Sequence, residues 1–407
     1  MKSSYHSKSL LASLLCLALI ICTAFSGCAP SARDKSGANS DENSSSPYKA
    51  YNDTQKFLQN IKVGWNLGNT FEATGRWGEE WNDSYSVNDV ETGWGNPTTT
   101  KAMFDKVKKT GFNAVRIPAT WYRHTDVENA TYTIKKDFLE RIKQVVDFAI
   151  DNDMYVILNM HHDDKDWLDI SANDEKWAAV KNEYAQIWTQ IAEQFKNYDE
   201  RLILEGANEI VLYTGVDENG NKQYDWWGQD DQTFERVNEL YQVFVDTVRK
   251  SGGKNDKRYL MIPTYGAQWY QHQIEKIIIP NGDERVIVDV HWYTDEADET
   301  KVRDTLKVIY DYCSYFEMPV VLGECGIRKA MTEEQKQNWA NNYIKIASNM
   351  GLRCFIWDDG GDYQVLDRNT VSWVSDSFVE SVVKNAVDVG SVPEPTSEAF
   401  DEIDSEE

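Results

Sequence analysis

Several features that would point to a particular function are scarce in this chain of 407 residues. It has six cysteines and six histidines, and the cysteines form no Cys-x-x-Cys pair, so the sequence gives no sign of a cysteine-based zinc site. Basic residues are few: 42 Lys and Arg stand against 67 Asp and Glu, which gives a formal net charge of −25. Nucleic acids and anionic membrane surfaces are bound through basic patches, so neither is an expected partner.

Long apolar runs are almost absent, and the one that occurs covers residues 10–25. Lys2 and Lys8 precede this run, which is too short for a comfortable membrane span. Small residues followed by Cys28 resemble a bacterial lipobox, so we expect residues 1–28 to be a lipoprotein-type signal peptide with Cys28 as the lipidated residue. An ordinary signal peptide cut nearby is the alternative. The expected location is secreted or cell-surface, with membrane contact only through that lipid anchor.

Apolar residues are also scarce in two further segments. Residues 29–47 are rich in Ser, Gly, Asn and charge, which predicts a flexible tether. Residues 393–407 are acidic, which predicts a disordered tail. The body between them, 48–392, shows no internal linker or repeat and predicts one domain, expected to be monomeric. The body contains three cysteines, Cys313, Cys325 and Cys354. Because three is an odd number, at least one of them has no disulfide partner within the body.

Aromatic residues, in contrast, are plentiful: 15 Trp, 21 Tyr and 14 Phe. A core accounts for some of them. A cleft for sugars accounts for more, because flat aromatic faces pack on the apolar faces of pyranose rings. Trp226 and Trp227 lie in a long loop, and we expect this loop to contact substrate, with simple loop packing as the alternative.

The body alternates short apolar runs with amphipathic stretches. Continuous apolar runs are typical of strands that are buried on both faces of a parallel sheet. The predicted strands are 61–65, 114–117, 155–159, 202–205, 259–262, 286–290, 320–323 and 353–356. Eight strands, each followed by a helix, predict an α/β fold: a (β/α)8 TIM barrel forming a single catalytic domain. An open doubly wound sheet is the alternative, but no Gly-rich phosphate turn follows the first strand.

Helical periodicity supports these assignments. Four apolar residues recur at the spacing of one buried helical face: Phe138, Ile142, Val145 and Ala149. Thr332 with Gln335 forms a capping-box pattern at the start of a further helix, in which the same spacing recurs at Trp339, Tyr343, Ile346 and Met350. Gly111 and Gly351 are expected to end helices in a left-handed conformation.

Polar residues stand at the carboxyl ends of the predicted strands, which is where a barrel of this kind builds its active site. Three of the six histidines of the chain are among them. The candidate site residues are Arg116, His161, His162, Asn208, Glu209, His291, Tyr293, Glu324 and Trp357. Their convergence from six strand ends predicts a catalytic site rather than scattered surface polarity.

Glu209 and Glu324 follow two different strands, and two facing carboxyl groups are what glycosidic cleavage requires. One protonates the leaving oxygen, and the other attacks or stabilises the anomeric carbon. A structural ion pair at a strand end is the alternative for either glutamate alone. The run His161-His162-Asp163-Asp164 could instead hold a metal. Neighbouring side chains on a strand point to opposite faces, however, so no metal ligand and no cofactor is expected.

Eight stretches of the body form a recognisable series: 64–70, 91–97, 111–118, 156–163, 204–209, 291–293, 319–324 and 357–360. In their order and spacing they resemble glycoside hydrolase family 5, specifically its cellulase-type members, over nearly the whole body. The stretch from Glu91 to Thr100 is most similar to the branch that holds endoglucanases, lichenases and xyloglucanases.

This resemblance implies roles at the matched positions. Glu209 would be the general acid/base and Glu324 the nucleophile. Asn208 would bind the sugar 2-hydroxyl, and three residues would hold Glu324 ionised: Arg116, His291 and Tyr293. His161 and His162 would line the subsite of the cleaved sugar, and Trp357 would be its stacking floor.

The function expected from this resemblance is that of a retaining endo-β-1,4-glucanase on a β-linked plant polysaccharide. Unbranched β-1,4-glucans are ranked first as substrates, followed by mixed-linkage glucan, xyloglucan and mannan. Two alternatives remain outside this reaction: a non-catalytic carbohydrate-binding protein at the cell surface and a metal-dependent barrel hydrolase. An endo-β-mannanase on the same scaffold is the alternative within it.

Overall fold

The structure, a computed structural model, describes residues 52–387 except 77, 78, 80, 127–131, 166 and 172. The predicted signal peptide (1–28), tether (29–47) and acidic tail (393–407) lie outside the described residues, as does Cys28, so these remain predictions. Among the described residues, no helix is both long enough and apolar enough to cross a membrane.

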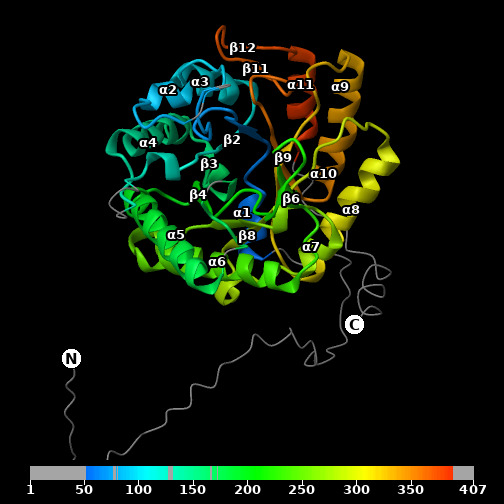
Figure 1. The fold of residues 1–407 in the computed structure, drawn as a ribbon. Coiled ribbons are helices and arrows are strands. Elements are labelled where there is room, and N and C mark those ends of the chain that lie inside the picture. Colours follow the sequence, from blue (N-terminus) through cyan, green and yellow to red (C-terminus); the bar gives the residue numbers. More distant parts are fainter. Residues whose placement is uncertain are drawn as a thin grey trace, which may run out of the picture. The chain divides into compact units, whose positions relative to one another are not determined.

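Eight parallel strands close into a barrel, which confirms the predicted (β/α)8 fold and rules out the open sheet (Figure 1). Each strand pairs in parallel with two neighbours in the order β1-β10-β9-β8-β7-β4-β3-β2. The strands are β1 (Gly64–Asn66), β2 (Ala114–Ile117), β3 (Tyr155–Asn159), β4 (Leu202–Glu205), β7 (Leu260–Pro263), β8 (Val286–His291), β9 (Val320–Cys325) and β10 (Arg353–Ile356). The largest error in the predicted bounds is at β1, which begins three residues later than expected.

Helices surround the barrel in Figure 1, and the predicted buried face of α4 is confirmed. They are α1 (Asp53–Leu58), α2 (Val87–Glu91), α3 (Lys101–Thr110), α4 (Lys136–Ile150), α5 (Asp174–Phe195), α6 (Asp231–Lys250), α7 (Gln271–Glu275), α8 (Glu299–Tyr315), α9 (Glu333–Trp339), α10 (Lys345–Asn349) and α11 (Asp376–Asn385). The short 3₁₀ segments are η1 (Tyr122–His124), η2 (His162–Lys165), η3 (Gly253–Lys257), η4 (Tyr265–Ala267) and η5 (Pro280–Gly282).

The predicted ends of these helices are borne out. Thr332 and Gln335 form the expected capping box at the start of α9. Gly111 and Gly351 both have positive φ, 122° and 75°.

The predicted buried helical face over 339–350 is confirmed, but the helix that carries it is not a continuous α-helix. A π-helical turn (η6, Ala340–Ile344) separates α9 from α10. This turn brings the hydroxyl of Tyr343 to 2.9 Å from the carbonyl oxygen of Trp292, just beyond β8. Single π turns often occur at functional sites, and here the turn supports the segment that follows a barrel strand.

Two small antiparallel ribbons stand outside the barrel. The segment after β4, predicted as a long loop, is a hairpin of β5 (Leu212–Val216) and β6 (Lys222–Asp225). Its connection contains Asn219-Gly220, a pair typical of hairpin turns. The other ribbon joins β11 (Leu366–Asp367) to β12 (Ser372–Trp373).

Two separate apolar clusters form the core. The larger packs the outward faces of the strands against the helices. The smaller lies inside the lower end of the barrel, where Phe57 and Leu58 of α1 meet inward-facing strand residues such as Ile157 and Ile287. Phe57 stacks on Tyr259, with ring centroids 3.7 Å apart. Helix α1 therefore closes the barrel at the end away from the carboxyl ends of the strands.

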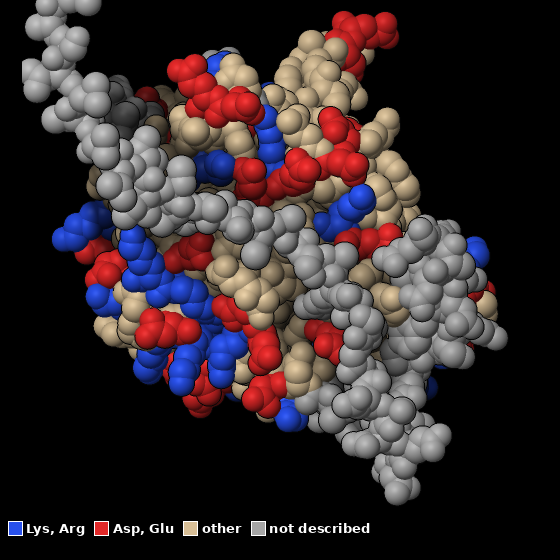
Figure 2. Space-filling model, turned by 90° about the horizontal axis from the view of Figure 1, so that it is seen from below, with Lys and Arg blue, Asp and Glu red and all other residues tan. Residues whose placement is uncertain are grey.

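Acidic and basic side chains are intermixed on the face in Figure 2, the underside of the view in Figure 1. Opposite charges also pair between helices of the described residues: Lys181 of α5 lies 2.5 Å from Glu239 of α6, and Lys276 lies 3.0 Å from Asp231 of α6. The negative net charge is therefore not gathered into a single patch on this face.

Candidate active site

The carboxyl ends of the strands enclose a layer of buried polar side chains, two residues beyond the apolar layer that α1 closes. The alternation of a strand places residues i and i+2 on the same face, so Arg116 follows Ala114 into the barrel and Asp289 follows Ile287. All members of this layer are fully buried: Asn66, Arg116, Asn159, Glu205 and Asp289.

Arg116 is the centre of this layer. Its guanidinium donates two hydrogen bonds of 2.7 Å to Glu205 and one of 2.6 Å to Oε1 of Glu324. It also donates to Oδ1 of Asn208 at 2.8 Å and to Oδ1 of Asn66 at 3.2 Å. One rigid, permanently charged fork thus fixes groups from β1, β4, β9 and the segment after β4.

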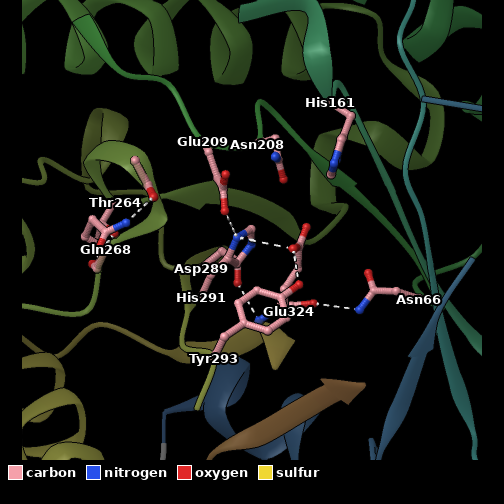
Figure 3. A network of polar contacts seen from close by, with 12 residues as sticks. Asn66, His161, Asn208, Glu209, Thr264, Gln268, Asp289, His291, Tyr293 and Glu324 are labelled. Atoms are coloured by element: carbon pink, nitrogen blue, oxygen red, sulfur yellow. Dashed lines mark hydrogen bonds and ion pairs between the residues drawn. The ribbon is translucent and has the colours of Figure 1, made fainter. Parts of the chain in front are cut away.

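His291 stands between the two candidate catalytic glutamates (Figure 3). Its Nδ1 lies 2.8 Å from Oε1 of Glu209 and 3.7 Å from Oε2 of Glu324, and its Nε2 lies 3.1 Å from Oδ2 of Asp289. Burial lowers the pKa of His291, but the surrounding carboxylates outweigh burial and raise it well above its usual value. Both ring nitrogens therefore donate, and Glu209, rather than Glu324, is the direct partner.

Glu324 is held from two sides. Arg116 binds Oε1, and the hydroxyl of Tyr293 donates to Oε2 at 2.6 Å. Burial and the adjacent charge of Glu324 raise the pKa of Tyr293 well above its usual value, so the phenol keeps the proton that it donates. The carboxylate is thereby fixed in one orientation, facing the cavity that it shares with Glu209.

A bulge in β9 turns Glu324 inward. The registers of β9 with β8 and with β10 both shift at this point, leaving one extra residue in β9 between Leu322 and Cys325. Regular alternation would place Gly323 inside and Glu324 outside. A side chain at Gly323 would lie 2.3 Å from Oδ1 of Asp289, so the bulge requires glycine there.

Glu209 and Glu324 lie close across the cavity. Oxygen atoms of the two carboxyl groups and a nitrogen of His291 all lie within 4.8 Å of one another. Among the described residues this trio has the composition and spacing of a metal site, but the hydrogen bonds of His291 engage both of its nitrogens. Carboxyl groups at this separation suit attack on one face of a carbon and protonation of its leaving group.

The pKa of Glu209 reflects two opposed effects. Burial raises it, but the hydrogen bond and the charge of His291 outweigh burial and lower it overall. Burial likewise raises the pKa of Glu205 to about 7, against the opposing charge of Arg116. The layer therefore contains carboxyl groups with different proton affinities, set by their surroundings.

The rings of His161, His162 and Trp357 lie together. The ring of His161 is parallel to that of Trp357, with centroids 5.9 Å apart, and meets the ring of His162 at 4.5 Å. The expectation that the two histidines point to opposite faces is wrong, because β3 ends at Asn159 and the chain turns into η2 at His162. Burial lowers the pKa of both, to about 4 for His162, so both rings are neutral near pH 7.

The sequence prediction missed four members of the polar layer: Asn66, Asn159, Glu205 and Asp289. Asn159 donates to Nδ1 of His161 at 2.9 Å, and Asp289 accepts from Nε2 of His291. The available signal was a polar residue inside a strand otherwise apolar, as with Asp289 between Val288 and Val290. A charge in such a strand is buried and needs partners.

Comparison with known proteins places the chain in one family. A family model described as cellulase (glycosyl hydrolase family 5) matches residues 70–362. Endoglucanase A of Ruminococcus albus is 33% identical over 351 residues, which cover 80% of this chain and 91% of that protein. Cellulase/esterase CelE of Acetivibrio thermocellus is also 33% identical and covers 81% of this chain, but this chain spans only 40% of its length.

Solved structures agree with this placement. A GH5-4 broad specificity endoglucanase from Ruminococcus champanellensis with bound cellotriose is 34% identical, with a TM-score of 0.74 over 81% of this chain and 97% of that one. XEG5A, a xyloglucan-specific endo-β-1,4-glucanase from a metagenomic library, is 34% identical, with a TM-score of 0.71 over 81% and 98%. A lichenase from Caldicellulosiruptor sp. F32 is 33% identical, with a TM-score of 0.72 over 84% and 97%.

Proposed function

Since this chain belongs to glycoside hydrolase family 5 and is an endoglucanase, we propose that it cleaves internal β-1,4 bonds of β-glucans by double displacement. Glu324 is the nucleophile and Glu209 the general acid/base. The observation that supports this most directly is that their carboxylate oxygens lie within 4.8 Å of each other on either side of His291. The short separation matches enzymes that retain anomeric configuration.

In the first step, an oxygen of Glu324 attacks the anomeric carbon and forms a glycosyl ester. The bond from that carbon to the leaving oxygen breaks, and Glu209 gives the leaving oxygen a proton. Arg116 and Tyr293 keep the attacking carboxylate ionised and oriented. In the second step, Glu209 takes a proton from water, the water oxygen attacks the anomeric carbon, the bond between that carbon and Glu324 breaks, and Glu324 leaves as a carboxylate.

Glu209 needs a proton for the first step, and His291 is its immediate partner. The two groups are in direct hydrogen-bond contact, so they titrate as a pair rather than singly. A bound polysaccharide excludes water from the cavity, and desolvation raises the pKa of a carboxyl group. Substrate binding therefore favours the protonated form of Glu209 at the stage when a donor is needed.

The remaining predicted residues bind the sugar whose bond is cut. The Oδ1 atom of Asn208 accepts from Arg116, so its amide N–H groups are directed away from Arg116 and serve the 2-hydroxyl. Neutral His161 and His162 offer hydrogen bonds to ring hydroxyls, and Trp357 provides an apolar face beneath the ring.

The substrates are β-glucans, with unbranched β-1,4-glucan first, then mixed-linkage glucan and xyloglucan, and mannan last. The similar solved structures include a broad specificity endoglucanase, a xyloglucan-specific one and a lichenase, which supports a wide range. Initial rates on carboxymethylcellulose, barley glucan, xyloglucan and glucomannan-free mannan test this order. Activity on mannan alone would show an endo-β-mannanase.

The mechanism is tested by replacing each glutamate with glutamine. We expect Glu324→Gln to lower kcat on soluble β-glucan by at least about 10⁴-fold, because no nucleophile remains. Glu209→Gln should be as severe on polymer, but added azide should restore turnover of an aryl cellobioside and give the β-glycosyl azide. Glu200→Gln, an exposed glutamate before β4, is the control. Full activity in Glu324→Gln or an inverted product would contradict the mechanism.

A further inference from the structure

Large aromatic side chains stand exposed beyond Glu209. The β5–β6 hairpin begins three residues after Glu209, and Tyr213, Trp226 and Trp227 on or just after it are 40%, 42% and 49% exposed. Exposed aromatic side chains grouped next to a candidate catalytic residue indicate a binding surface rather than packing. The proposed mechanism uses none of them.

Lys165, at the end of η2, joins this hairpin to Glu209. Its Nζ donates to the backbone oxygen of Glu209 at 3.0 Å and lies 4.9 Å and 5.1 Å from the ring centroids of Tyr224 and Trp226. The Nζ of Lys222 in β6 donates to the backbone oxygen of Lys165 at 2.9 Å. A single side chain thus contacts both the backbone of the general acid and an aromatic ring of the hairpin.

Asp164 anchors the Lys165 ammonium. Its Oδ2 lies 2.6 Å from Nζ, its side chain is only 3% exposed, and its Oδ1 is buried without a hydrogen-bond partner among the described residues. Burial raises the pKa of Asp164 to about 7, and the charge of Lys165 opposes this rise. A buried pair that leaves one oxygen unpaired is costly for stability, so a role in positioning explains it better.

We propose that Trp226 forms a subsite for the glucosyl unit on the leaving side of the cut bond, and that Lys165 is a positioning residue that couples this subsite to Glu209. This inference rests on the proposed function, because it takes Glu209 as the proton donor. The donor contacts the leaving oxygen, so the leaving portion of the chain extends toward the side of Glu209, where the hairpin lies. Trp357, His161 and His162 serve the other portion.

The coupling follows from shared contacts. A glucosyl ring stacked on Trp226 removes water from the Lys165 ammonium, which strengthens the electrostatic interactions that the ammonium makes in turn. The hydrogen bond to the carbonyl of Glu209 then fixes the backbone from which the donor extends. Binding energy from a sugar that does not react is in this way used to orient the group that does.

Two substrates separate the leaving side from the rest of the site. Cellotetraose needs both the leaving-side subsite and a proton donor. 2,4-Dinitrophenyl β-cellobioside needs neither in the first step, which kcat/KM reports, because its leaving group departs without a proton. We expect Lys165→Met to lower kcat on cellotetraose by about 10- to 100-fold and Trp226→Ala to raise KM by about tenfold. For both variants, kcat/KM on the aryl cellobioside should stay within about threefold of the value for the unchanged enzyme, because kcat/KM reports only the first step.

The controls address charge and folding. Lys176→Met removes an exposed lysine of α5 and should leave the kinetics on both substrates unchanged. Lys165→Arg keeps the charge and should recover part of kcat, and Trp226→Phe part of the affinity. Equal losses on both substrates, or unchanged cellotetraose kinetics, would overturn the proposal.

The same assay separates this inference from the proposed function. The unchanged enzyme must release dinitrophenol from the aryl cellobioside, and Glu324→Gln must abolish that release. If the aryl substrate gives no such result, the proposed mechanism fails. If the aryl substrate behaves as expected but Lys165→Met affects both substrates equally, or leaves cellotetraose kinetics unchanged, only the leaving-side coupling fails.

Discussion

The lower and upper halves of the barrel interior are built by the same strands and differ in chemistry. Below, Ile157 and Ile287 meet α1 in an apolar cluster. Two residues further along these strands, the inward positions are Asn159 and Asp289, and they join a hydrogen-bonded polar network. A step of one strand period, about 6.6 Å, therefore separates an interior that stabilises the fold from one that supports chemistry.

Removing the charge at the centre of the upper half should have the largest effect. Arg116→Met leaves Glu205 and Glu324 buried without their counter-ion, so we expect a loss of about 3–5 kcal/mol in the free energy of unfolding. The kcat on soluble β-glucan should fall at least about 100-fold because Glu324 loses its orientation. Urea unfolding and initial rates measure the two effects.

A matched control lies outside the barrel interior. Arg141→Met also breaks an ion pair, a partly buried one with the buried Glu91 at 2.7 Å, and should lower stability while kcat stays unchanged. If Arg141→Met lowered kcat as much as Arg116→Met, the separation between the polar layer and the rest of the fold would be contradicted.

The lower half should respond in stability alone. Phe57→Ala removes the ring that stacks on Tyr259 and meets Tyr155 edge to face, so we expect about 2–4 kcal/mol less free energy of unfolding. Because this cluster lies below the polar layer, kcat and KM measured well below the melting temperature should not change. A large change in kcat with unaltered stability would show that the two halves are not independent.

A smaller effect concerns His124, a buried histidine of η1 outside the polar layer. Its ring stacks on Phe138 at 3.6 Å, and burial, with the charge of Lys135, lowers its pKa from 6.5 to about 3. The unfolded chain therefore binds a proton that the folded protein excludes between pH 6.5 and about 3, so stability is lost as pH falls through this window. By pH 4.5 the loss is about 2–3 kcal/mol.

The measurement is urea unfolding at pH 7 and pH 4.5 in the unchanged protein and in His124→Phe, which keeps the stacking. The variant should lose less stability between the two pH values. Other buried groups, such as Glu72 with its pKa raised to about 7, titrate in both proteins and cancel in this difference. Identical pH slopes would contradict a buried neutral His124.

Much of this architecture follows from local sequence. Apolar runs predicted all eight strands, because strands covered on both faces need uninterrupted apolar residues. The polar residues after those runs predicted which side chains converge, since parallel strands deliver their carboxyl ends to one place. Glu209, Glu324 and His291 were found in this way.

What local sequence did not provide are features set by packing between distant segments. The bulge in β9 depends on its register with both neighbours, and the π turn at Tyr343 depends on the carbonyl of Trp292. Local sequence also did not show that His291, beside its ion pair with Glu324 at 3.7 Å, hydrogen-bonds Glu209 at 2.8 Å. Lys165 gave no signal, because its contacts come from three separate segments.

The extra residue in β9 bears on how such a site arises in a barrel. Shifting a strand by one residue exchanges its two faces. The one extra residue between Leu322 and Cys325 therefore places inside the barrel a side chain that regular alternation would have placed against the helices. A designer who grafts this nucleophile onto another barrel has to transplant the irregular backbone, and the glycine beside Asp289, along with the glutamate.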